Sequence, residues 1–129
     1  MDTVDPEKVN LEERFGRFGD LWSPKIIGTV NDYDLKLVKV RGEFVWHQHD
    51  DTDEFFLVTK GRLRIQLEGR ADVVLGPGEF VVVPRGLRHC PIAEVETQVI
   101  LLEPRGTVNT GDAAQIGTAG EELGAASPG

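Results

Sequence analysis

The sequence predicts an all-β protein, an antiparallel sandwich or barrel preceded by one short N-terminal helix. Between residues 25 and 104 the chain is a series of short apolar or alternating segments separated by turn residues. Residues 6–22 instead repeat their apolar side chains with the 3.6-residue period of a helix. Many short strands with no helix between them are typical of antiparallel sandwiches and barrels.

The N-terminal segment, residues 1–24, is expected to contain a helix over Pro6–Trp22 that covers one face or mouth of the barrel. Its apolar stripe consists of Leu11, Phe15, Phe18 and Trp22. Asp5 is a suitable N-cap, and Pro6 suits the first helical position because proline lacks the N–H that would have no partner there.

The strands are predicted between turn residues such as Asn31-Asp32, Gly76-Pro77-Gly78 and Arg85-Gly86. In order, the expected strands are 25–30, 35–40, 43–47, 54–59, 62–68, 72–75, 80–83, 88–92 and 97–103. Alternation is clearest in residues 62–68, where Leu63 and Ile65 should face the core because successive strand side chains point to opposite faces.

The barrel is expected to occupy residues 25–110 as a single domain. From Gly111 to Gly129 the chain is rich in alanine and glycine and has no aromatic residue. Such a composition offers little surface to bury, so residues 111–129 are predicted to form a flexible tail.

The net charge of −8 argues against binding to nucleic acid or to anionic membrane surfaces, which need a basic face. No apolar run approaches the roughly 20 residues of a membrane-spanning helix. The first residues have neither the basic nor the apolar region of a signal peptide. The single cysteine cannot form an internal disulfide. We therefore expect a cytoplasmic protein.

The three histidines of the chain form the main chemical pattern. His47 and His49 are two positions apart at a predicted strand end, so their imidazoles should enter the same space. Glu54 follows a short acidic turn and begins the next strand, where a hairpin would return it beside the pair. His89 follows a second turn-rich segment. Taken alone, a His-x-His pair is more often ordinary surface or core polarity than a metal site.

Three imidazoles and one carboxylate would suit a single divalent transition metal ion, namely Fe, Mn, Ni, Zn, Co or Cu. The hard ions Mg and Ca prefer all-oxygen sites. Four protein ligands on an octahedral ion would leave two positions for water, substrate or dioxygen.

Two segments resemble the paired motifs of the cupin superfamily. Residues 42–61, GEFVWHQHDDTDEFFLVTKG, resemble the first motif, with glycine, His-x-His, glutamate and glycine in order. Residues 78–93, GEFVVVPRGLRHCPIA, resemble the second, with glycine, Pro-x-Gly and histidine. The resemblance covers roughly residues 35–104 and implies a double-stranded β-helix, the jelly-roll or cupin barrel. It places the metal ligands on His47, His49, Glu54 and His89.

Two positions depart from the family pattern. Four residues rather than five separate Gly42 from His47, which shifts a turn and not a ligand. Ala93 stands where the family usually has asparagine, so a side-chain hydrogen bond is absent there.

Strand alternation places four further residues on the ligand face: Val45, Phe56, Val58 and Pro91. They would form an apolar wall suited to a small organic substrate, although core packing explains them equally well. Arg85 and Arg88 could steer an anionic ligand, but a solvated loop is the commoner role. Cys90 should face away from His89 as a small buried residue.

The resemblance implies a metal-dependent enzyme acting on a small oxygenated organic molecule. A dioxygenase is the first expectation, followed by an isomerase, lyase or decarboxylase. The alternative is a non-catalytic module that contains a metal and binds a small ligand. An open strand edge such as residues 25–30 favours a homodimer.

Overall fold

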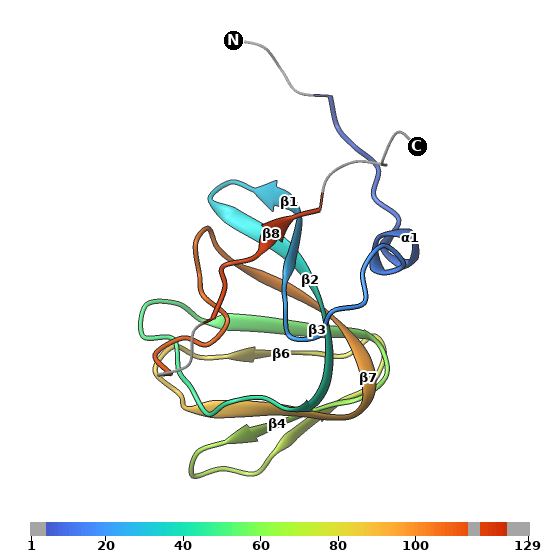
Figure 1. Ribbon diagram of the computed structural model, residues 1–129. Coiled ribbons are helices and arrows are strands. Elements are labelled where there is room, and N and C mark those ends of the chain that lie inside the picture. The colour runs from blue at the N-terminus through green and yellow to red at the C-terminus, as the bar shows by residue number, and fades with distance from the viewer. Residues whose placement is uncertain (1–4, 114–116, 124–129) are drawn as a thin grey trace.

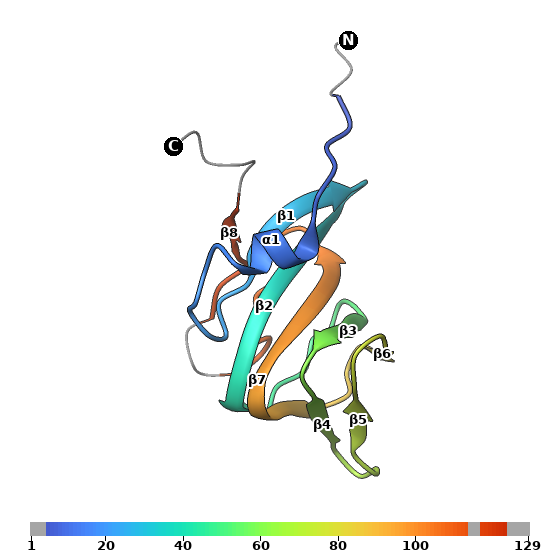
Figure 2. The same ribbon diagram turned by 90° about the vertical axis from the view of Figure 1, so that its right-hand side faces the viewer.

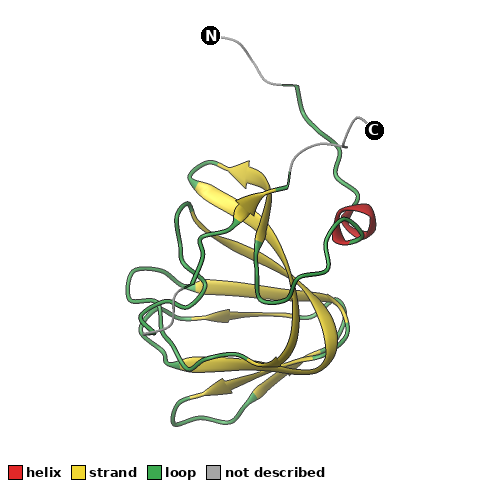
Figure 3. Ribbon diagram, viewed as in Figure 1, coloured by secondary structure: helices red, strands yellow, loops and turns green. Residues whose placement is uncertain are grey.

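The fold is organised around one long central strand, β7 (His89–Pro104), which pairs with three of the other described strands. The computed structural model describes residues 5–113 and 117–123. Figure 1 shows its strands wrapped into a barrel, and Figure 3 shows how few residues are helical. The remaining elements are α1 (Leu11–Phe15), β1 (Lys25–Val30), β2 (Tyr33–Glu43), β3 (Glu54–Lys60), β4 (Leu63–Leu67), β5 (Val73–Leu75), β6 (Phe80–Val83) and β8 (Glu121–Glu122).

Strand β7 pairs with β2 on one edge and changes partner on the other. Its first residues pair with β4, and its later residues, from Gln98 to Leu102, pair with β3. Between these stretches residues 94–96 are exposed, and the β2–β7 register shifts between Val40 and Gly42. Such an irregularity bends a strand and increases its twist, which allows the sheet to curl. The mainly antiparallel barrel expected from the sequence is confirmed, with a parallel β1–β8 pair added.

The core lies inside the curled sheet and consists of alternate strand residues. Leu63 and Ile65 of β4 are buried, as their alternation predicted. Ala93 is also buried, in the core rather than at the surface. Burying each Val, Leu or Phe side chain contributes about 1.5–3 kcal/mol to folding. The buried cluster comprises Val38, Val40, Phe56, Val58, Leu63, Ile65, Leu75, Val83, Ala93, Val99 and Leu101.

The predicted helix over Pro6–Trp22 is wrong in extent, because only α1 is helical. The N-cap is Asn10, whose side chain accepts a hydrogen bond from the Glu13 N–H at 3.0 Å, and not Asp5. The helix ends at Gly16, a residue that costs about 1 kcal/mol relative to alanine inside a helix. Trp22 has φ 57°, which no right-handed helix permits. Figure 2 shows α1 in front of β2, outside the barrel.

Two strand predictions also differ from the structure. Residues 43–47 do not form a separate strand: β2 runs on to Glu43, and His47 makes an isolated bridge with His89. The two strands expected at 88–92 and 97–103 are one, β7. The described part of the chain contains no helix long and apolar enough to cross a membrane.

The C-terminal residues that the structure describes contact the barrel, unlike the free tail expected from composition. Glu121 donates its N–H to Pro24, and Leu123 donates its N–H to Ile26 at 2.9 Å. These bonds extend the β1 edge by the short strand β8. Alternation and composition could not reveal this pairing because β8 has only two residues. The rest of the predicted tail, residues 114–116 and 124–129, lies outside the described residues.

Candidate metal centre

The structure brings the four predicted ligand residues together at one end of the barrel. Glu54 is the first residue of β3, His89 is the first residue of β7, and His47 and His49 follow β2. One nitrogen or oxygen atom from each of the four lies within 4.8 Å of the others. All four side chains are buried, with His49 the most exposed at 8%.

Two of the imidazole rings are held by the backbone beside them. His47 Nδ1 lies 2.9 Å from the Val45 carbonyl oxygen, and His89 Nδ1 lies 2.8 Å from the Leu87 carbonyl oxygen. A carbonyl only accepts, so each Nδ1 carries the proton and donates it. These bonds leave Nε2 of each ring directed into the cluster. This is the arrangement by which outer hydrogen bonds orient histidine ligands.

The atoms that face one another in the cluster have no hydrogen-bond partner outside it. They are Nε2 of each of the three histidines and Oε2 of Glu54, and all four are inaccessible to solvent. His49 Nε2 and Glu54 Oε2 are in close contact, and His89 Nε2 lies 3.6 Å from the same oxygen. Buried polar atoms are almost always paired, so four facing orphans need a shared partner. The donor set fits a divalent transition metal ion.

Electrostatics maintain two of these groups in the form that binds metal. Burial and the neighbouring His89 lower the pKa of His47 to about 4, so its ring is neutral at pH 7. Burial acts to raise the pKa of Glu54, but His49 and His89 outweigh it and lower the pKa to about 2. Burial acts to lower the pKa of His49, but the Glu54 carboxylate outweighs burial, so the pKa of His49 is raised. Neutral imidazole and ionised carboxylate are the ligating species.

An apolar cavity lies inside the barrel beside the cluster. Of the expected pocket residues, Phe56 and Pro91 line it together with His47 and Glu54. Val58 is fully buried in the core, and Val45 contributes the carbonyl oxygen that holds the His47 ring. The cavity has a volume of about 30 Å³, room for about one water molecule. A substrate would enter only if part of the lining moved.

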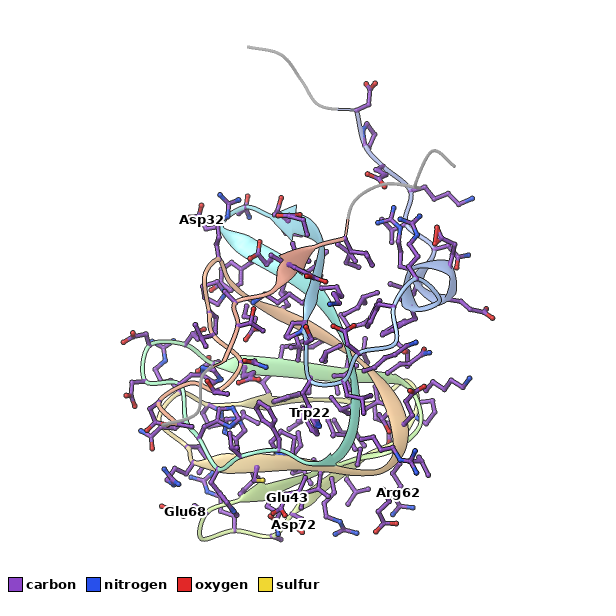
Figure 4. The ribbon with its side chains drawn as sticks, viewed as in Figure 1. Trp22, Asp32, Glu43, Arg62, Glu68 and Asp72 are labelled. Atoms are coloured by element: carbon purple, nitrogen blue, oxygen red, sulfur yellow. The ribbon has the colours of Figure 1, made fainter. Side chains whose placement is uncertain are left out.

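Trp22 lines one side of this cavity from a loop, and not from the covering helix that the sequence predicted. Its ring stacks on Phe44 at 4.5 Å between centroids, and its Nε1 donates to the Arg41 carbonyl at 2.9 Å. The Asn109 side chain donates to the Trp22 carbonyl oxygen. In Figure 4 the labelled Trp22 lies over the middle of the barrel. Its helical spacing from Phe18 concealed this position, because a loop and not a helix places it.

A separate open cleft of about 470 Å³ is lined by His49, and it lies between residues 48–52 and residues 104–112. Its charged residues are Asp50, Asp51, Asp112 and Arg105. The two arginines considered from the sequence lie elsewhere, since Arg85 pairs with Asp53 and Arg88 with Glu68.

A buried ion pair near Glu54 was also not predicted from the sequence. Lys36 Nζ donates to Glu103 Oε1 at 3.1 Å and to the Thr107 carbonyl at 3.1 Å, and neither charged side chain is more than 1% exposed. Burial and the nearby Glu54 raise the pKa of Glu103 to about 7. Alternation from Leu101 would have placed Glu103 inside the barrel.

Cys90 lies on the strand face opposite His89 and is fully buried. Burial and the nearby Glu43 raise the pKa of its thiol to about 11. The thiol is therefore protonated at neutral pH, which suits a packing role rather than a nucleophile.

The chain is similar to known proteins in sequence and in fold. A cupin-2 domain containing protein from Shewanella frigidimarina NCIMB 400 is 45% identical and superposes with a TM-score of 0.73, over 75% of this chain and 94% of that one. The uncharacterized protein YdbB of Bacillus subtilis is 34% identical over 77 residues, which are 60% of this chain and 68% of YdbB.

More distant structures share the fold alone. Hydroquinone 1,2-dioxygenase from Sphingomonas sp. TTNP3, solved with 4-hydroxybenzoate bound, is 20% identical, with a TM-score of 0.70 over 76% of this chain and 32% of that enzyme. The assignment to a family comes from the sequence itself, since residues 35–105 match the Cupin_2 family, described as the cupin domain. This match spans more than half of the chain and includes all four residues of the cluster, so the protein is a member of the cupin domain family.

Proposed function

We propose that this cupin is a metal-dependent enzyme that acts on a small oxygenated organic molecule. Dioxygenation is the first reaction class we propose, ahead of isomerisation, lyase chemistry or decarboxylation. The observation that supports a metal-dependent function is the set of four buried ligand atoms without other partners. A site built only for stability would cost less with apolar side chains in these positions.

His47, His49, Glu54 and His89 would hold one divalent ion. When bound, such an ion supplies Lewis acidity and sites at which a substrate oxygen or dioxygen can bind. The single carboxylate of Glu54 offsets only part of the charge of a divalent ion. The centre would therefore favour a ligand that is anionic or becomes so, such as an enolate, phenolate or carboxylate.

The surrounding residues would determine how a substrate lies and how protons move. Phe56 and Pro91 give the cavity apolar walls, which would suit the carbon skeleton of a small molecule once part of the lining had moved. Glu103, buried close enough to Glu54 for their charges to interact, has a pKa of about 7 and can hold or release a proton near neutral pH. These features support an enzyme more than a passive store.

The comparison with hydroquinone 1,2-dioxygenase supports the order of the reaction classes. That enzyme has a barrel of the same fold and was solved with an aromatic carboxylate bound. Its sequence identity of 20% limits the likeness to the fold, so the substrate class is our proposal and rests on the apolar cavity and the charge of the centre.

The test is turnover by the metal-loaded protein. Protein stripped of metal and reloaded with Fe(II) or Mn(II) would be incubated with hydroquinones and with small keto and enol acids, with oxygen uptake and product mass as readouts. We expect turnover of at least one compound, lost in His49→Ala. Binding of metal and of a small ligand without turnover would instead establish the alternative, a non-catalytic binding module.

A further inference from the structure

Three different segments hold the backbone of residues 47–49, which carry two of the proposed ligands. His47 exchanges both of its backbone hydrogen bonds with His89, at 3.0 and 2.8 Å. The His49 carbonyl accepts a hydrogen bond from the Gly86 N–H at 2.8 Å. The residue between the histidines, Gln48, is held by neither of these segments.

Asp112 hydrogen-bonds both the backbone N–H and the backbone carbonyl of Gln48. The Gln48 N–H donates to Asp112 Oδ1 at 2.9 Å, and the Asp112 N–H donates to the Gln48 carbonyl at 3.2 Å. No regular strand continues through residues 44–49, so these two bonds take the place of strand pairing there. Asp112 lies beyond residues 35–105, the part of the chain that matches the cupin family.

Gly111 allows the segment around Asp112 to approach this closely. A Cβ atom at Gly111 would lie 3.1 Å from His47 Cδ2 and closer still to the Gln48 carbonyl oxygen. The residue also has φ 52°, in the left-handed region that glycine adopts without strain. A tight turn presents it, since the Gly111 N–H donates to the Val108 carbonyl at 3.0 Å.

We propose that Asp112 is a positioning residue for the metal centre, and that Gly111 permits its approach. By fixing both peptide groups of Gln48, Asp112 sets how His47 and His49 are directed toward their common point. This inference rests on the proposed function, because it assumes that the four-residue cluster binds metal. Outer partners that orient ligands typically change metal affinity by about 10- to 100-fold when they are removed.

The negative charge of Asp112 could by itself attract a cation, and Asp50 provides the control for this effect. Asp50 is an exposed carboxylate in the loop that follows His49, and among the described residues it bonds only the side-chain amide of Gln48, at 2.6 Å. Asp50→Ala therefore removes an equal charge from the same cleft and leaves the backbone of Gln48 held. Asp112→Asn removes the charge but keeps an oxygen acceptor for the Gln48 N–H.

The experiment is a titration of the metal-free full-length variants with Co²⁺, followed by calorimetry and by the visible absorption of the bound ion. We expect Asp112→Ala to lower Co²⁺ affinity by about 10- to 100-fold and to change the absorption spectrum. Gly111→Ala should act in the same direction. Asp112→Asn and Asp50→Ala should remain close to the unmodified protein. The proposal is overturned by unchanged affinity and spectrum in Asp112→Ala, or by equal losses in all the charge-removing variants.

A measurement without metal separates this inference from the proposed function. Amide hydrogen exchange, measured by NMR on the metal-free protein, should be faster at the Gln48 N–H in Asp112→Ala than in Asp50→Ala. Unchanged exchange in Asp112→Ala would refute the positioning role. If the unmodified protein took up no Co²⁺ and Gln48 exchange still depended on Asp112, the proposed metal function would fail while the backbone role of Asp112 stood.

Discussion

His47 and His89 are joined by both of their backbone hydrogen bonds and also face each other through their rings. The N–H of each donates to the carbonyl of the other, at 3.0 and 2.8 Å, and the ring centroids are 4.3 Å apart. This bridge joins the two sequence motifs of the family beside the ligands, in addition to the pairing of β3 with β6. Main-chain hydrogen bonds thus hold the ligands of the first motif next to the ligand of the second, so the side chains converge over short distances.

Metal content provides the first prediction. Protein purified without chelator should contain close to one transition metal ion per chain, measured by elemental analysis, because four buried donors face one point. His49→Ala and Glu54→Ala should each lose most of this metal. Metal at 100 times its dissociation constant stabilises the fold by about 2.7 kcal/mol, so chelation should lower the melting temperature. Equal metal content in both variants and the unmodified protein would contradict the site.

The second prediction concerns acid stability of the metal-free protein. The pKa of His47 falls from 6.5 to about 4 on folding, so between these values the unfolded chain binds more protons than the folded one. The contribution of His47 to the free energy of unfolding must then fall by up to about 3 kcal/mol as the pH drops from 6.5 to 4. Glu103, whose pKa is raised to about 7, has the opposite effect, since its contribution grows as the pH falls from 7.

Comparison with a variant isolates the contribution of His47. Urea unfolding of the metal-free protein at several pH values should show a shallower loss between pH 6.5 and pH 4 in His47→Gln than in the unmodified chain. Parallel curves would mean that His47 is protonated in the folded state at the same pH as in the unfolded one.

The third prediction concerns the buried ion pair. Glu103→Leu alone should destabilise the protein by about 3–5 kcal/mol, because it leaves the buried Lys36 ammonium without its carboxylate partner. Lys36→Met should cost less, because Glu103, with a pKa of about 7, can take up a proton. The double variant should be more stable than either single variant. Asp72→Asn, which breaks the exposed pair with Arg64, is the control and should cost no more than about 1 kcal/mol. Additive losses in the double variant, measured in urea, would show that the two side chains act separately.

The C-terminal segment gives the fourth prediction. A chain that ends at Ala113 should melt several degrees lower, because it loses the Glu121 and Leu123 bonds to the β1 edge. Lys25, only 2% exposed, also loses one of its two carboxylate partners. A loss of 1 kcal/mol lowers the melting temperature of a domain of this size by about 2–8 °C. Glu122→Gln, an exposed change in the same strand, should leave it unchanged, and an unaltered melting temperature in the truncated chain would be inconsistent with docking.

Self-association is the fifth prediction. Within the described residues β8 pairs with only Lys25 and Ile26, so the β1 edge from Gly28 to Val30 has no strand beside it. An open edge invites pairing with a second copy, and we expect a homodimer at micromolar concentration by light scattering. Val30→Lys places a charge on that edge and should shift the protein toward monomer. A monomeric unmodified protein would reject the prediction.

Several features could be predicted because they depend on local repetition. The bounds of β1 and β6 match the expected strands, since turn residues flank both. Two-residue alternation in β4 placed Leu63 and Ile65 in the core. The helix failed for a related reason: a helical spacing of Leu11, Phe15, Phe18 and Trp22 exists, but the chain leaves the helix at Gly16 and brings Trp22 to the barrel separately.

By itself, the sequence determined the all-β class, the residues able to ligate a metal and the family to which their spacing belongs. It did so because strand alternation and motif spacing are properties of neighbouring residues. Only the tertiary structure decided that β7 is continuous, that Trp22 lines the cavity from a loop, that Lys36 meets Glu103 and that Asp112 holds Gln48. Each of these contacts joins segments whose approach depends on how the whole sheet curls, and no local period encodes that curvature.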